Sequence, residues 1–144
     1  MVSDLKYIME SKNENKIKHL EFIQLTITRM NVNSFLLKGW TVTLISALFV
    51  LSAKDANINY VLISYIVIPV FWILDGFYIA VERQYRELYN DVAKKKEIDI
   101  DFSMDAKKFA KGNKCWLGGI FSITLLIFYG VCIFTTLIVM YLIK

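Results

Sequence analysis

Three long apolar stretches constrain what this chain can fold into, at residues 34–53, 60–80 and 115–143. A helix needs about 20 mostly apolar residues to cross a hydrocarbon core about 30 Å thick, and each stretch reaches that length. With 56% hydrophobic residues among 144, a soluble single domain has too little interior to hide these side chains. The sequence therefore predicts an all-α membrane protein with three transmembrane helices.

Each predicted span has its own peculiarity. Lys38 interrupts the first, and its long stem can carry the ammonium to the headgroup level. The second contains Pro69 and Asp75, which a membrane helix holds if neighbours or water satisfy the disturbed groups. The third is uncharged from residue 116 to residue 143, and those residues would extend about 42 Å as one helix. We therefore expect the third span to tilt or protrude.

Basic residues flank these spans unevenly. Six lie in residues 1–38 and nine in residues 81–114, whereas the loop 54–59 holds only one. Short cytoplasmic loops retain Lys and Arg, so the N-terminus is predicted to be cytoplasmic and the C-terminus external. The first apolar run starts too far into the chain for a cleavable signal peptide, so the first span is expected to be retained.

The remaining segments are predicted to be helical or to form turns. Residues 1–32 show apolar positions at steps of three or four, including Ile23 and Ile27, and are predicted to be an amphipathic cytoplasmic helix that lies on the membrane or packs on other helices. Asn31, Asn33 and Ser34 are expected to end it. Residues 54–59 are predicted to form an external turn and residues 81–114 a cytoplasmic helical segment. Within that segment, residues 97–101 are expected to be extended, and Ser103 is expected to cap a short helix at 104–111.

Polar residues gather near the predicted cytoplasmic face. Asp75 is costly inside a membrane, so it is expected either to reach the headgroups or to pair with Lys38 or Arg29. Tyr78, Glu82, Tyr85 and Tyr89 continue the same helical stripe, as membrane-interface anchors or as a docking surface. Glu82 and Arg83 are spaced to pair with Arg86 and Glu87. The candidate functional polar cluster comprises Arg29, Lys38, Asp75, Tyr78, Glu82 and Arg83.

Small residues recur at four-residue spacing in two spans. Gly39, Thr43 and Ala47 do so in the first, and Gly118 with Ser122 in the third. Such patterns allow helices to approach closely. These residues are candidates for packing within the monomer or for an oligomer interface, and the pattern is also common without any role.

Catalytic and metal-binding signatures are missing from the sequence. His19, the single histidine, stands in no metal-ligand motif and is expected at a surface or interfacial helix position. Cys115 and Cys132 lie about 25 Å apart along one predicted helix and are expected to be free thiols. No nucleotide-binding fingerprint appears, and membrane topology explains the net charge of +4 better than nucleic-acid binding does. No enzyme activity, metal or cofactor is predicted.

Two segments carry a resemblance to a known group. Residues 19–40 read HLEFIQLTITRMNVNSFLLKGW, and residues 71–92 read FWILDGFYIAVERQYRELYNDV. With the motifs H-L-E-F-I-Q, R-M, N-S-F, K-G-W, L-D-x-x-Y and E-R, the chain resembles a family of small uncharacterised bacterial inner-membrane proteins. The resemblance spans about half the chain. It implies a bacterial membrane protein with specific polar positions near the cytoplasmic face, and it implies no activity or substrate.

These features favour a non-enzymatic oligomeric membrane protein whose contacts are the bilayer, other copies of itself and a cytoplasmic protein partner. By analogy with small membrane effectors of bacterial defence systems, it is expected to receive a signal and to permeabilise the membrane. The alternative is a membrane anchor or adaptor that recruits a soluble partner. A small transporter ranks third, because the spans offer only scattered Ser and Thr besides Asp75.

Overall fold

The computed structural model describes the backbone of residues 2–55, 57 and 59–143 and the side chains of residues 13–54, 57 and 59–142. This part of the chain is helical, with α1 (Val2–Asp55), α2 (Asn59–Lys94), α3 (Trp116–Ile120) and α4 (Ile123–Ile143). Three single 3₁₀ turns, η1 (Glu97–Asp99), η2 (Lys107–Phe109) and η3 (Gly112–Lys114), connect α2 to α3. Three helices, α1, α2 and α4, are long and apolar enough to cross a membrane. The fold is that of a multi-pass membrane protein.

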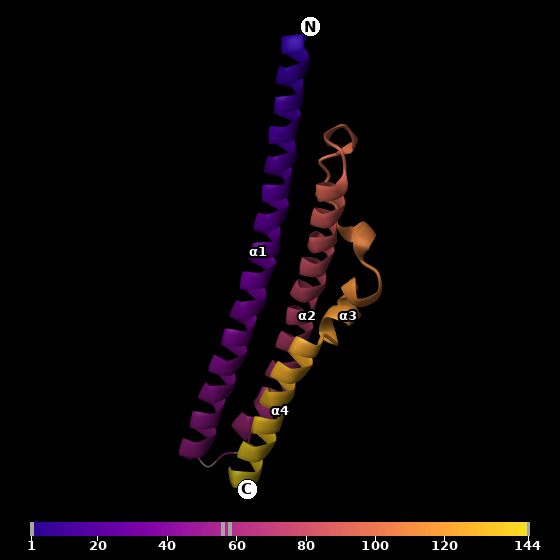
Figure 1. Cartoon of the computed structure of the whole chain (residues 1–144). Helices are drawn as coiled ribbons and strands as arrows, with labels where there is room; N and C mark the ends of the chain where they lie inside the picture. The colour runs from indigo at the N-terminus through magenta and orange to yellow at the C-terminus, as the bar shows by residue number, and fades with distance from the viewer. Residues whose placement is uncertain (1, 56, 58, 144) are drawn as a thin grey trace.

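Helix α2 is central. It packs along α1 and also contacts α3 and α4, whereas α1 and α4 touch each other little. Figure 1 shows α1 and α2 running side by side, α4 beside the first half of α2, and the two termini at opposite ends. We call the part formed by residues 13–33 and 81–114 the basic end, and the opposite part, around residues 54–59, the turn end. Two residues of the predicted external turn, 56 and 58, lie outside the described residues.

The expected break between an N-terminal helix and the first span is wrong. Helix α1 passes through Asn31, Asn33 and Ser34 without interruption. None of these residues is Pro or Gly, and the Ser34 hydroxyl bonds to the side chain of Asp75 instead of capping a backbone amide. The prediction that the helix of the second span continues past residue 80 is confirmed, because α2 runs on to Lys94.

The third apolar stretch is not the single helix expected for residues 115–143. Helix α3 ends at Ile120, and α4 begins at Ile123. The 21 residues of α4 extend about 31 Å, close to the thickness of the hydrocarbon core. The indole Nε1 of Trp72 donates to the Ile120 carbonyl at 2.9 Å, which satisfies an acceptor that the break leaves free. The third apolar stretch is therefore longer than one span, and the break after α3 leaves α4 with the length of a single span.

The connector between α2 and α3 also differs from its prediction. The connector expected to be extended at 97–101 forms a 3₁₀ turn at 97–99 and is extended at Ile100. The α-helix expected at 104–111 is a single 3₁₀ turn at 107–109. Asp101, Ser103 and Asp105 each accept from the backbone N–H two residues ahead, at 2.9–3.2 Å. Such local bonds compete with helix formation, because they give the backbone another partner.

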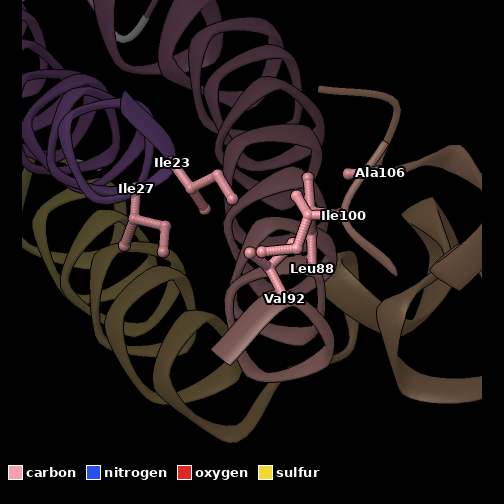
Figure 2. Packing of buried hydrophobic residues seen from close by; sticks show 6 residues of the cluster. All are labelled: Ile23, Ile27, Leu88, Val92, Ile100 and Ala106. Atoms are coloured by element: carbon pink, nitrogen blue, oxygen red, sulfur yellow. The ribbon is translucent and has the colours of Figure 1, made fainter. Parts of the chain in front are cut away.

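A hydrophobic core lies at the basic end. Ile23 and Ile27 of α1 point toward Leu88 and Val92 of α2, and Ile100 and Ala106 of the connector close the cluster (Figure 2). The amphipathic segment therefore packs on other helices of the chain. Ile17, which lies on the same predicted apolar face six residues before Ile23, is 49% exposed, so the buried part of this face is shorter than the spacing of its apolar residues suggests. The predicted apolar positions before residue 13 lie outside the described side chains.

Two glycines hold α2 and α3 in backbone contact. A Cβ added to Gly119 would stand 2.1 Å from the Gly76 carbonyl oxygen, and one added to Gly76 would stand 2.8 Å from the Ile120 Cα. Backbone atoms cannot swing aside as a flexible side chain can. The approach of α3 to α2 therefore depends on the missing side chains.

We expect Gly119→Ala to destabilise the protein by about 1–3 kcal/mol, because the added methyl forces the two backbones apart. Gly130→Ala is the matched control, since a Cβ at Gly130 of α4 meets nothing within 4 Å. Thermal melting in detergent, followed by circular dichroism, compares the two variants. Equal melting temperatures for Gly119→Ala and the unmodified protein would contradict the contact.

Candidate functional site

A buried carboxylate joins three helices near the start of the first span. Asp75 of α2 has no exposed surface. Its Oδ1 accepts from the Ser34 hydroxyl of α1 at 2.5 Å, and its Oδ2 accepts from Lys38 Nζ at 2.6 Å and from the Tyr129 hydroxyl of α4 at 3.2 Å. We call Ser34, Lys38, Asp75 and Tyr129 the Asp75 cluster.

Helical spacing and aromatic packing position these partners. Ser34 and Lys38 lie one turn apart on α1, and Lys38 Nζ also donates to Ser34 Oγ at 2.7 Å. On the other side, the Tyr129 ring stacks on Trp72, with centroids 5.7 Å apart and an interplanar angle of 8°. Because Trp72 also bonds to the Ile120 carbonyl, the break between α3 and α4 is tied to the cluster.

The cluster neutralises a charge that the membrane disfavours. A buried ion is tolerated when a counter-ion and hydrogen bonds replace its water. Asp75 receives both, and the Lys38 side chain remains 20% exposed. Of the alternatives for Asp75, the structure therefore has the pairing with Lys38. With three donors on its two oxygens, the carboxylate is suited to holding α1, α2 and α4 in register.

The predicted functional cluster does not assemble as a whole. Arg29 is exposed on α1, and Tyr78 packs edge-on to Phe77, with centroids 5.7 Å apart. Glu82 is 6% exposed and pairs with Arg86. Only Lys38 and Asp75 of the predicted set meet. Trp72 and Tyr129 were not predicted, because no motif or spacing distinguishes Trp72 and because Tyr129 lies in a charge-free span.

Arg83 and Gln84 fasten the connector to α2. Arg83 donates to the carbonyls of Asn113 and Gly118 at 2.7 and 3.0 Å, and Gln84 donates to that of Lys114 at 2.7 Å. The expected pair between Arg83 and Glu87 is wrong, because Glu87 pairs with Lys114 at 2.8 Å. These bonds satisfy carbonyls around η3 and set where α3 begins.

The two small-residue patterns lie in different environments. Gly118 packs on the backbone of Asn113, and Ser122 is 5% exposed, so both face the inside of the chain. Gly39, Thr43 and Ala47 are exposed, and a Cβ at Gly39 would meet nothing within 4 Å. We call these three residues the small-residue face. It is turned away from the described part of the chain.

His19 is not at the surface position expected for it. It is 5% exposed, and its ring meets Phe102 edge-on with centroids 5.5 Å apart. Its Nε2 atom has no hydrogen-bond partner within the described part of the chain. Burial lowers the pKa of the imidazole below 6.5, against the attraction of Asp101, which favours the charged form. Phe102 has a positive φ of 52°, a strained conformation for a residue with a side chain.

Among the residues searched, no group of three or more His, Cys, Asp or Glu side chains is arranged to hold a metal ion. Cys115 and Cys132 are free thiols, as expected. No family model, curated protein or solved structure matches the chain. The resemblance to the bacterial inner-membrane family remains a prediction.

Removing one partner of the central ion pair should cost more than removing both. We expect Lys38→Met and Asp75→Leu each to destabilise the protein by about 3–5 kcal/mol, because each leaves a buried charge without its partner. The double variant should be more stable than either single variant. Unfolding of the four proteins in detergent forms a double-mutant cycle. Additive losses would show that the two side chains do not interact.

The buried His19 should make stability depend on pH. Its pKa is lowered in the folded protein, so below pH 6.5 the unfolded chain takes up a proton that the folded chain resists. We expect the melting temperature to fall between pH 7 and about pH 5.5, and to fall less in His19→Phe. The pKa of Asp91 is lowered by its bond from Lys95 and that of Asp101 by the Ser103 amide, so both titrate below this range. An unchanged pH profile in His19→Phe would contradict the assignment.

Proposed function

We propose that this protein is a non-enzymatic, self-associating membrane module whose basic end receives a cytoplasmic partner or signal. The observation that carries the proposal is the outward direction of the small-residue face, Gly39, Thr43 and Ala47. Small residues let membrane helices approach closely, and this face is exposed on the described part of the chain. A second copy is the occupant that such a face suits best.

Continuous helices support a link between the membrane and the basic end. Helix α1 has no interruption between the core around Ile23 and the turn end. Helix α2 is likewise continuous and leads from the turn end back to the basic end. A continuous, packed helix is one kind of element that carries coupling between distant sites. Partner binding at the basic end would therefore reach the small-residue face through α1.

The proposed setting is the bacterial inner membrane, with the basic end in the cytoplasm. Fifteen of the 17 Lys and Arg residues lie in residues 1–38 and 81–114, which supports this orientation. The proposed output is altered membrane permeability, as in small effectors of bacterial defence systems. Because the Asp75 cluster is paired inside one chain, a conducting path would have to form between copies.

Gly39→Leu should reduce self-association, because a large side chain on the small-residue face keeps two α1 helices apart. We expect the detergent-purified variant to shift toward monomer in light scattering coupled to size-exclusion chromatography. Gly130→Leu is the matched control, since Gly130 is also exposed in a span and also has open space at its Cβ position.

The same variants test whether the protein alters membrane permeability. Liposomes carrying the unmodified protein should leak an entrapped dye, and those carrying Gly39→Leu should leak less. A monomeric unmodified protein would overturn the self-association. A Gly39→Leu variant that associates as the unmodified protein does would overturn the small-residue face as its contact. Liposomes that stay sealed with an oligomeric protein would overturn the permeability output alone.

A membrane adaptor is the second candidate. The internal pairing of Asp75 favours it, because the cluster leaves the spans without a free charge at this depth among the described residues. An adaptor with passive spans would keep its partner when the spans are replaced by unrelated ones. The same pairing counts against a transporter, which needs polar groups along a substrate path.

A further inference from the structure

A groove at the basic end remains without an occupant. It has a volume of about 810 Å³ and lies between α1 and the connector. Its apolar side chains are Phe22, Leu25, Phe102 and Met104, and its polar ones are Asn15, Lys18, His19, Thr26 and Arg29. Phe22 and Leu25 are 62% and 64% exposed.

The exposed apolar side chains of this groove are not explained by lipid. Phe22 stands 12 residues before Ser34, about 18 Å along α1 from the start of the predicted span. Headgroups add only about 5–8 Å on each side of the hydrocarbon core. Phe22 therefore faces water if the span begins at Ser34. An apolar surface in water that is rimmed by polar residues is typical of a protein-binding site.

The charge of the groove distinguishes between two possible occupants, an acidic partner and a second copy of the chain. Arg29 is exposed and has no ion pair among the described residues, and Lys18 adds a second cation although it pairs with Glu14. Two copies in one membrane share an orientation, so a symmetric contact through this stretch of α1 would set Arg29 against Arg29 and Lys18 against Lys18. Like charges facing each other are destabilising. The groove thus suits an acidic occupant better than a second copy.

We propose that this groove binds an acidic amphipathic helix of a soluble partner. The proposal rests on the partner-receiving basic end proposed above, and it specifies the chemistry of that partner. Residues 15–29 extend about 21 Å along α1, the length of a helix of about 14 residues. The apolar face of the partner would cover Phe22 and Leu25, and its carboxylates would meet Lys18 and Arg29.

His19 is a buried polar residue in the lining of the groove. Its unpartnered Nε2 is enclosed, and the Phe102 ring packs against the imidazole. Both side chains line the groove, and Phe102 holds a strained backbone conformation. A displacement of Phe102 by the partner would relieve the strain and open His19 to a hydrogen bond.

Fluorescence anisotropy with two synthetic peptides tests the proposal. Both are 14-residue helices with the same leucine face, and one carries Glu where the other carries Lys. We expect the acidic peptide to bind the detergent-purified protein and the basic peptide to bind at least about 10-fold more weakly. Phe22→Ala and Arg29→Ala should each lower the affinity for the acidic peptide by about 10-fold. The controls are Ile98→Ala and Lys111→Ala, which change an exposed apolar residue and an exposed cation outside the groove.

Equal binding of the two peptides, or unchanged affinity in both groove variants, would overturn the proposal. Groove variants that dissociate the protein into monomers would instead assign the groove to a second copy, which also overturns it. Gly39→Leu should still bind the acidic peptide in preference to the basic one, because Gly39 lies outside the groove. Failure of the groove is therefore distinguishable from failure of self-association.

Discussion

The carboxylate of Asp75 has no exposed surface, so groups of the protein have to replace its water, and the arrangement of α1, α2 and α4 meets this requirement. Lys38 supplies the opposite charge, and Ser34 and Tyr129 supply two further hydrogen bonds. Each helix contributes at least one member, so a slip of any helix by one turn would leave a polar group unpaired. The cluster therefore fixes the register of the bundle more strictly than apolar packing, which tolerates exchange of similar side chains.

The molecule divides into two regions, the spans and the basic end, in which exposed apolar side chains have different consequences. Within the spans, exposed apolar side chains need no protein cover, because lipid is as apolar as they are. At the basic end, Ile23, Ile27, Leu88 and Val92 form a core of the kind found in soluble proteins. The exposed Phe22 and Leu25 therefore call for an explanation, whereas equally exposed residues of the spans do not.

Short-range signals in the sequence predicted the helices well and their boundaries less well. The three apolar stretches and the extension of α2 were read correctly, since hydrophobic length and helix propensity are local properties. The polar residues from Asn31 to Ser34 looked like a helix end, but Ser34 has a distant partner that no local rule identifies. In the connector, the side chains of Asp101, Ser103 and Asp105 capture backbone amides, and helix periodicity does not report that competition.

By itself, the sequence determined that the chain is helical, that three of its segments suit a membrane, and that Asp75 either reaches the headgroups or needs a partner, because these follow from composition and spacing along one helix. Only the tertiary structure decided that Lys38 and not Arg29 is that partner, that Tyr129 joins them, and that His19 is enclosed behind Phe102. It also decided that Gly76 and Gly119 meet while Gly39 faces outward. These are contacts between residues far apart in the chain, and they depend on how each helix is rotated about its axis, which one-dimensional periodicity does not specify.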